Sequence, residues 1–252
     1  MMRACLAAAV LAALAVGCAP RPAVSLPTLP DPTAREWTRL RERLAIARDA
    51  APTTAYVEHL VLAMREPRTG KVFQARGAVA VDPGRALRMI LVGPGGVTAL
   101  DAWVTDERFR FEVPGIAYVR RGGVDPVAER GLPIAFLRWW LLHPLDGRLL
   151  AGWTRDDGAL FLLRQGDETV LLREGRSARM RRTHVVAALR EDGRVQRLEW
   201  YGNAPAAPHA GDMARYIDGA SGLEVEVKVE EVQKEPPDGA AFLDPDAKDT
   251  AL

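Results

Sequence analysis

The segment GLPIAFLRWWLLHP, residues 131–144, constrains the fold most, because it is the one long helical pattern in a region otherwise rich in strands. Pro133 suits the first turn of a helix and Pro144 cannot continue one, so a helix is predicted from about residue 133 to 143. Its apolar residues cover most of the circumference, and Arg138 is its only charge. A helix of this length is too short to cross a bilayer. It therefore either lies inside a large core or closes an apolar cavity.

Short β-rich runs separated by turn residues make up most of the remaining chain. They occupy residues 56–64, 72–81, 87–92, 98–105, 108–113, 116–120, 148–153, 160–164, 169–173, 178–189, 195–201, 214–217 and 223–232. Apolar and polar residues alternate in 194–200 and 223–229, so one face of these strands is expected to meet water. Residues 87–92, apart from Arg88, and residues 159–163 are apolar on both faces, so a helix is expected to cover them.

These patterns predict a mainly β fold. We expect a strongly curved antiparallel sheet, or unclosed β-barrel, of about ten or eleven strands, with an N-terminal helix and a lid helix on the concave side. The N-terminal helix begins with a capping box formed by Thr33 and Glu36 and is expected to end near Asp49. Its narrow apolar stripe consists of Trp37, Leu40, Leu44 and Ala47.

The start of the chain predicts the cellular localisation of the protein. A basic start, an apolar run over residues 4–16 and the pair Gly17-Cys18 are typical of a lipoprotein signal peptide that ends in a lipobox. Acylation of Cys18 would anchor the mature chain to a membrane without spanning it. The alternative is an ordinary secreted protein whose signal peptide contains a cysteine. The predicted organisation is a signal peptide (1–17), a Pro-rich tether (18–32), a single domain (33–243) and a tail (244–252).

Charge and motifs exclude several classes of function. Loss of Arg3 with the signal peptide leaves 33 of the 34 basic residues to balance 33 acidic ones, so no overall charge attracts nucleic acid. With Cys18 acylated, no cysteine remains for a disulfide or a Cys–His pair. The four histidines (His59, His143, His184 and His209) have no metal-ligand spacing. We therefore expect no metal, no cofactor and no enzymatic activity.

Two motifs resemble the LolA/LolB lipoprotein-localisation superfamily, and LolB-like outer-membrane lipoproteins in particular. In LolB-like proteins a turn of the form Asn-Pro-apolar-Gly joins two strands, and a later Gly-x-Pro-Ile/Leu-Pro helix carries Leu-Arg-x-Trp. Here GPGG (93–96) stands at the turn, and GLPI (131–134) followed by LRWW (137–140) stands at the helix. The order of elements matches over roughly residues 37–232.

The resemblance implies an unclosed barrel whose helices cover an apolar cavity that receives the acyl chains of other lipoproteins. The lid side would be lined by Ile134, Leu137, Trp139, Trp140 and Leu141, and the barrel side by Leu87, Met89, Leu91, Trp103 and Phe111. It also implies lipid or lipoprotein acyl chains and a periplasmic LolA-like carrier as partners. Ala19 stands where an aspartate would favour the inner membrane, so by the rule of this class the protein faces the periplasm from the outer membrane.

One departure concerns the membrane-facing turn formed by Pro94, Gly95, Gly96 and Val97. LolB exposes a bulky apolar residue there, which is implicated in passing cargo to the membrane. This chain has Gly95 at that place, and Val97 nearby is small. Delivery of cargo is therefore not implied by the resemblance, even if the cavity is present.

Two hypotheses for function follow. The first is a lipid-anchored, non-enzymatic protein that binds acyl chains and accepts or holds lipoproteins during outer-membrane localisation. The second is a structural or accessory lipoprotein that fills its barrel with side chains and acts through a protein-binding surface. The basic hairpin with Arg173, Arg176, Arg179, Arg181 and Arg182 is a candidate for such a surface; the alternative, and the more common case, is a solvated strand face.

Overall fold

The structure is a computed structural model. It describes residues 31–67, 69–125, 127–142, 145–156, 158–165, 168–175, 183–189, 195–201, 208–218 and 221–247.

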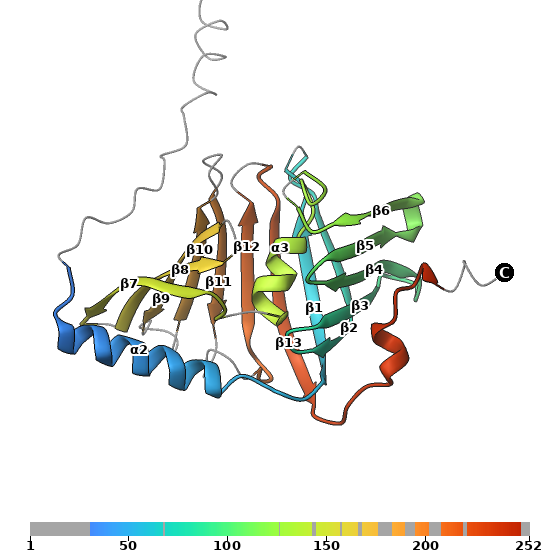
Figure 1. The fold of residues 1–252 in the computed structure, drawn as a ribbon. Coiled ribbons are helices and arrows are strands. Elements are labelled where there is room, and N and C mark those ends of the chain that lie inside the picture. The colour runs from blue at the N-terminus through green and yellow to red at the C-terminus, as the bar shows by residue number, and fades with distance from the viewer. Residues whose placement is uncertain are drawn as a thin grey trace, which may run out of the picture.

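One antiparallel sheet dominates the described part of the chain (Figure 1). Its strands are β1 (Tyr56–Arg65), β2 (Val72–Asp82), β3 (Ala86–Val92), β4 (Thr98–Thr105), β5 (Arg108–Val113), β6 (Tyr118–Gly123), β7 (Arg148–Arg155), β8 (Gly158–Gln165), β9 (Glu168–Gly175), β10 (Thr183–Leu189), β11 (Val195–Tyr201), β12 (Met213–Asp218) and β13 (Glu224–Gln233). The sheet has thirteen strands, more than the ten or eleven expected, because every β-rich run in the sequence forms its own strand.

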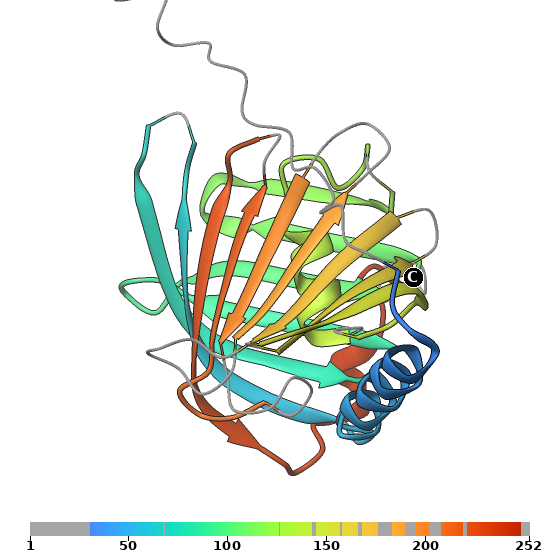
Figure 2. The ribbon, with the colours of Figure 1, turned by 90° about the vertical axis from the view of Figure 1, so that its left-hand side faces the viewer.

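The strand order is β6-β5-β4-β3-β2-β1-β13-β12-β11-β10-β9-β8-β7. Two meanders, β1 to β6 and β7 to β13, are therefore joined along a central seam where β1 pairs with β13. The edges of the sheet are β6 and β7, which are consecutive in the chain. The segment between them carries the helix and crosses the concave side, where Figure 2 shows it between strands of the two meanders. The predicted unclosed, curved sheet is confirmed.

The predicted alternation is clearest in β13, where Val225, Val227 and Val229 are buried and the residues between them are exposed. The expectation that residues 87–92 are covered on both faces is wrong. Leu87, Met89 and Leu91 are buried, but the side chains of Ile90 and Val92 are 45% and 37% exposed. The reason is that β3 is covered on its concave face, whereas the end of its outer face meets solvent. In β8, residues 159–163 are buried or half-buried throughout.

The N-terminal helix α2 (Ala34–Asp49) has the predicted bounds and cap. The Glu36 carboxylate accepts a 2.8 Å hydrogen bond from the Thr33 backbone N–H, and the Thr33 hydroxyl accepts one from the Glu36 N–H. Leu40 and Leu44 are buried in the common core, and α2 packs against β7. Arg48, in the last turn, donates from Nε to the carbonyl oxygen of Leu145 at 2.9 Å.

The predicted central helix consists of two parts. An α-helical turn, α3 (Ile134–Leu137), continues into a π-helical turn, η3 (Arg138–Leu142). Positions 143 and 144, where the helix was expected to end, lie outside the described residues. None of the described helices has both the length and the apolar character that a membrane crossing requires.

The C-terminal residues form a strap, residues 234–247, on the outer side of the sheet (Figure 1, red). It contains the 3-10 turn η4 (Gly239–Phe242), which packs against β2 and β3. Asp244 pairs with Arg108 at 3.0 Å, and Asp246 pairs with Arg110 at 3.2 Å. Residues 244–247, assigned to a tail in the sequence analysis, are thus tied to β5.

Candidate functional site

The segment α3–η3 occupies the concave face of the sheet and is almost wholly buried. Eight of its nine residues are buried, and Arg138 is the exception. Nine of the ten residues predicted to line the cavity belong to one core cluster: Leu87, Met89, Leu91, Phe111, Ile134, Leu137, Trp139, Trp140 and Leu141. The structure therefore brings the lid residues and the barrel residues together on this face.

These side chains contact one another and do not border an open space. The nine residues are between 0 and 6% exposed, and Leu87, Met89, Leu91 and Ile134 have no exposed surface at all. A cavity large enough for water would leave its lining partly accessible. In this part of the barrel the helix therefore packs closely on the concave face.

Phe136 makes two aromatic contacts, one within the helical segment and one with the sheet, and neither was predicted from the sequence. Phe136 stacks on Trp140 with ring centroids 5.4 Å apart, and on Tyr216 of β12 at 5.3 Å. Phe136 therefore connects the helix to the second meander. The alternation in β12 places Ala214, Tyr216 and Asp218 on the buried face, and this was the available signal for Tyr216.

The assignment of Trp103 to the cavity is wrong. Its neighbours Ala102 and Val104 face the core, whereas Trp103 is paired with Arg88 of β3 and Arg110 of β5 on the outer face. Because successive side chains point to opposite faces of a strand, a residue between two core residues cannot line the same interior. The indole is buried instead by the strap.

The turn between β3 and β4 has the compact form that its glycines allow. The Gly93 N–H donates to the carbonyl oxygen of Val97 at 2.9 Å. Gly95 and Gly96 adopt φ values of 86° and 80°, which side chains other than glycine rarely adopt. Pro94, Gly95, Gly96 and Val97 are all exposed. The turn thus presents only the small side chain of Val97, 63% exposed, beside Pro94.

A buried acidic pair lies near one end of the interior. Glu58 of β1 is only 1% exposed, and its Oε2 has no hydrogen-bond partner among the described residues. Burial, and then the nearby carboxylate of Asp212, raises the pKa of Glu58 from 4.5 to about 8. Burial also raises the pKa of Asp212, whose carboxylate accepts a 2.8 Å hydrogen bond from the His209 N–H. Glu58 is thus a neutral carboxylic acid at pH 7.

Among the described residues, the ion pair between Arg138 and Asp106 is the one salt bridge that joins α3–η3 to the sheet. Its Nη2–Oδ1 distance is 3.9 Å, and both side chains are partly exposed. Such a pair contributes little to stability. The helix is consequently held on the sheet by apolar packing.

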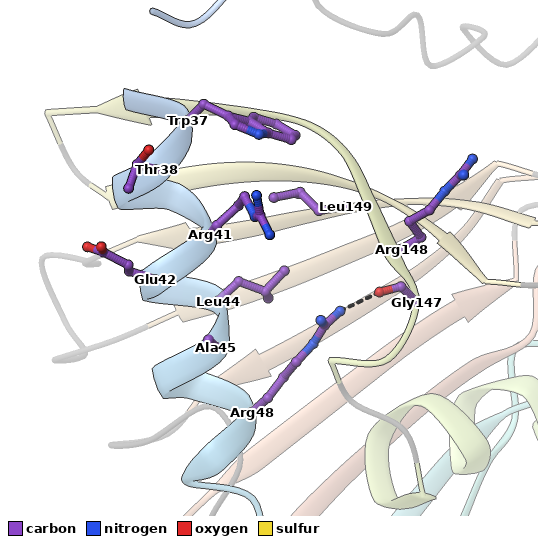
Figure 3. A pocket seen from close by; sticks show the side chains of 10 residues that line it. All are labelled: Trp37, Thr38, Arg41, Glu42, Leu44, Ala45, Arg48, Gly147, Arg148 and Leu149. Atoms are coloured by element: carbon purple, nitrogen blue, oxygen red, sulfur yellow. Dashed lines mark hydrogen bonds between the residues drawn. The ribbon is translucent and has the colours of Figure 1, made fainter. Parts of the chain in front are cut away.

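A second concave feature lies between α2 and the start of β7 (Figure 3). This α2–β7 groove has a volume of about 610 Å³. Its lining consists of Trp37, Thr38, Arg41, Glu42, Leu44, Ala45, Arg48, Gly147, Arg148 and Leu149. This site was not predicted from the sequence, because the residues that form it are distant in the chain.

Other predicted features are less informative. Within the described ranges, no three His, Cys, Asp or Glu side chains are grouped closely enough to hold a metal ion. Cys18 and most of the tether lie outside the described residues, as do Arg176, Arg179, Arg181 and Arg182 of the basic hairpin.

Comparison with known proteins finds similarity in overall structure. A LolA superfamily protein from Nitrosomonas europaea is 11% identical, with a TM-score of 0.49 over 81% of this chain and 97% of that one. A domain described as an outer membrane lipoprotein-sorting protein, from Vibrio parahaemolyticus, is 10% identical, with a TM-score of 0.47 over 79% and 94%. A DUF1329 family protein from Desulfovibrio piger is 16% identical, with a TM-score of 0.42 over 85% and 98%.

No protein-family model matches the chain, and no curated protein matches it. None of these likenesses singles out LolB.

Proposed function

We propose that this chain is a lipid-anchored envelope protein that binds acyl chains on the concave face of its sheet. Its role would be to accept or hold lipoproteins during outer-membrane localisation, at the periplasmic side of the outer membrane. The observation that carries the proposal is the segment α3–η3, an apolar helix packed on an apolar concave face with one weak ion pair to the sheet. An acyl chain offers this face the same kind of contact.

Binding on this face requires that the helix move, because it packs closely against the described residues of the concave face. Each buried CH₂ of an acyl chain contributes about 0.8 kcal/mol and needs no polar partner, so an acyl chain can replace the contacts that the helix gives up. Gly131, at φ 77° just before the helix, is a position where the backbone can turn. The π-helical geometry of η3 is a further feature that often accompanies functional segments.

The test is native mass spectrometry of the mature chain from Ala19 onward, purified without its lipid anchor from a bacterial host. We expect adducts of fatty-acid or phospholipid mass, and their loss in Leu141→Glu, which places a charge on the buried face of the lid. Ile90→Glu is the matched control, because Ile90 lies exposed on the outer face of β3. It should retain the adducts. Retention of adducts by a folded Leu141→Glu variant would contradict the proposal.

A second candidate function is favoured by the close packing of the described core residues. Leu87, Met89 and Ile134 have no exposed surface, as in an ordinary close-packed core. In this case the chain is an accessory lipoprotein that acts through a protein-binding surface. A clean apo mass, together with failure to take up an added fluorescent acyl probe, would favour this candidate over acyl-chain binding.

A further inference from the structure

We propose that the α2–β7 groove binds the phosphate-bearing headgroup of an acidic phospholipid at a membrane surface. This is a second site, on the exterior of the domain, and it does not depend on whether the interior opens. Figure 3 shows the groove between one side of α2 and the segment that leads into β7. Its volume of about 610 Å³ is within the range of small-molecule sites, which is about 300–1,000 Å³.

The charges of the groove favour an anion. Arg41 and Arg48 extend into it, Arg148 lies at its edge with its side chain directed away from α2, and Glu42 supplies the one carboxylate of its lining (Figure 3). Arg48 is oriented by the main chain, since its guanidinium donates to the carbonyl oxygens of Leu145 and Gly147. Among the described residues, neither Arg41 nor Arg148 has an acidic partner. Guanidinium groups bind phosphate oxygens through paired hydrogen bonds.

The apolar part of the groove favours an amphipathic ligand over a free anion. Trp37, Leu44 and Leu149 contribute apolar surface beside the arginines, and Figure 3 shows Arg41 and Leu149 extending toward each other from opposite walls. Tryptophan is enriched where proteins meet the headgroup region of a membrane, because its ring has an apolar body and a polar N–H. Inorganic phosphate would use only the arginines.

The position of the groove in the chain points to a lipid surface. Trp37 lies in the first turn of α2, and α2 is the first element after the predicted tether. A Pro-rich tether over residues 18–32 extends by about 3.1 Å per residue and reaches at most about 45 Å. If Cys18 is acylated as predicted, a tether of this length allows the groove to reach the bilayer surface.

The experiment is co-sedimentation of the mature chain from Ala19 with vesicles, since this chain contains every helix and strand of the structure. Vesicles of phosphatidylcholine alone are compared with vesicles that contain phosphatidylglycerol. We expect binding to the anionic vesicles, and about a tenfold or greater loss in the double variant Arg41→Gln/Arg148→Gln, because it removes two cations from the contact. A brominated phospholipid should quench tryptophan fluorescence less in Trp37→Phe than in the unmodified chain.

The matched control removes the same charge elsewhere. Arg76 pairs with Glu230 and Arg85 pairs with Asp82, both outside the groove. The double variant Arg76→Gln/Arg85→Gln should keep vesicle binding within about twofold, since neither cation lies at the proposed contact. Equal losses in the two double variants would show general electrostatic attraction and overturn the proposal. Binding of glycerol phosphate without any binding to anionic vesicles would also overturn the proposal.

Uptake of an acyl probe separates this site from the proposed function. Arg41→Gln/Arg148→Gln should take up the probe as the unmodified chain does, while losing the vesicles. Loss of probe uptake in Leu141→Glu with vesicle binding intact would give the reverse pattern. Loss of vesicle binding and loss of probe uptake can therefore be measured independently, so the two proposals can fail separately.

Discussion

Trp103 of β4 donates a 3.0 Å hydrogen bond from its indole Nε1 to the main-chain carbonyl oxygen of Phe242. This contact fastens the strap to the outer face of the sheet. Trp103→Phe keeps most of the apolar area but loses the hydrogen bond, so the free energy of unfolding should fall by about 1 kcal/mol. Urea denaturation followed by circular dichroism measures the change. Uptake of an acyl probe should be unaffected. Reduced uptake would contradict the assignment of Trp103 to the outer face.

Removal of the last residues of the strap should destabilise the domain more than its exposed position suggests. In a chain that ends at Leu243, Arg110 loses Asp246, which pairs with it at 3.2 Å. The Arg110 side chain is only 17% exposed, so water cannot fully replace this partner. Leaving a partly buried cation with fewer partners costs about 1–3 kcal/mol. Thermal unfolding should show a lower Tm for this chain. A chain that ends at Ala247 is the control, and an equal Tm for the two would contradict the prediction.

Glu58 predicts an unusual pH dependence of stability. Its folded pKa is raised to about 8 by burial and by Asp212, whereas the unfolded group titrates near 4.5. Between these values the folded state holds a proton that the unfolded state has lost. The free energy of unfolding should therefore fall as pH rises from about 5 to 8, by at most about 1.4 kcal/mol per pH unit from this group.

Glu58→Gln provides the test, since glutamine has the same shape and no titration. Its urea denaturation midpoint should depend less on pH over this interval than that of the unmodified chain. Burial raises the pKa of Asp212 and of Tyr56 as well, and Asp212 will leave some residual slope of the same sign. Identical pH profiles for the two proteins would exclude Glu58 as the source.

Among the described glycines, Gly77 is the one where an added methyl group should lower stability most. A Cβ there would collide with the carbonyl oxygen of Ile90 and lie 2.8 Å from the Leu91 Cα, both in the main chain of the neighbouring strand β3. Gly77→Ala should lower the free energy of unfolding by about 2 kcal/mol or more, because main-chain atoms have to shift. Gly115→Ala meets nothing within 4 Å and serves as the control. Equal denaturation midpoints would contradict the prediction.

Local sequence patterns were sufficient for much of the fold. The capping box at Thr33 and Glu36 fixed the start of α2 within one residue, and turn residues separated every strand. The helical pattern that contains Trp140 and Leu141 predicted a helix on the concave side of the sheet, which the structure contains. These features depend on neighbours in the chain, which a sequence displays directly.

Features that depend on the far ends of the chain could not be predicted in the same way. Trp103 was assigned to the wrong face because its burial comes from the strap, more than a hundred residues away. The α2–β7 groove joins Arg41 to Arg148, and the buried pair joins Glu58 to Asp212. In each case the partner is set by strand order, which periodicity does not determine.

The central seam also determines when folding of the sheet can be completed. Val57 pairs with Gln233, so the middle of the sheet joins the first strand to the last. Each meander can form from contacts between consecutive strands, but β1 stays an uncovered edge until β13 has been synthesised. Throughout that interval the nascent chain exposes a strand that is competent to pair with other molecules. The last step of folding is thus the pairing that covers β1 and leaves β6 and β7 as the edges of the sheet.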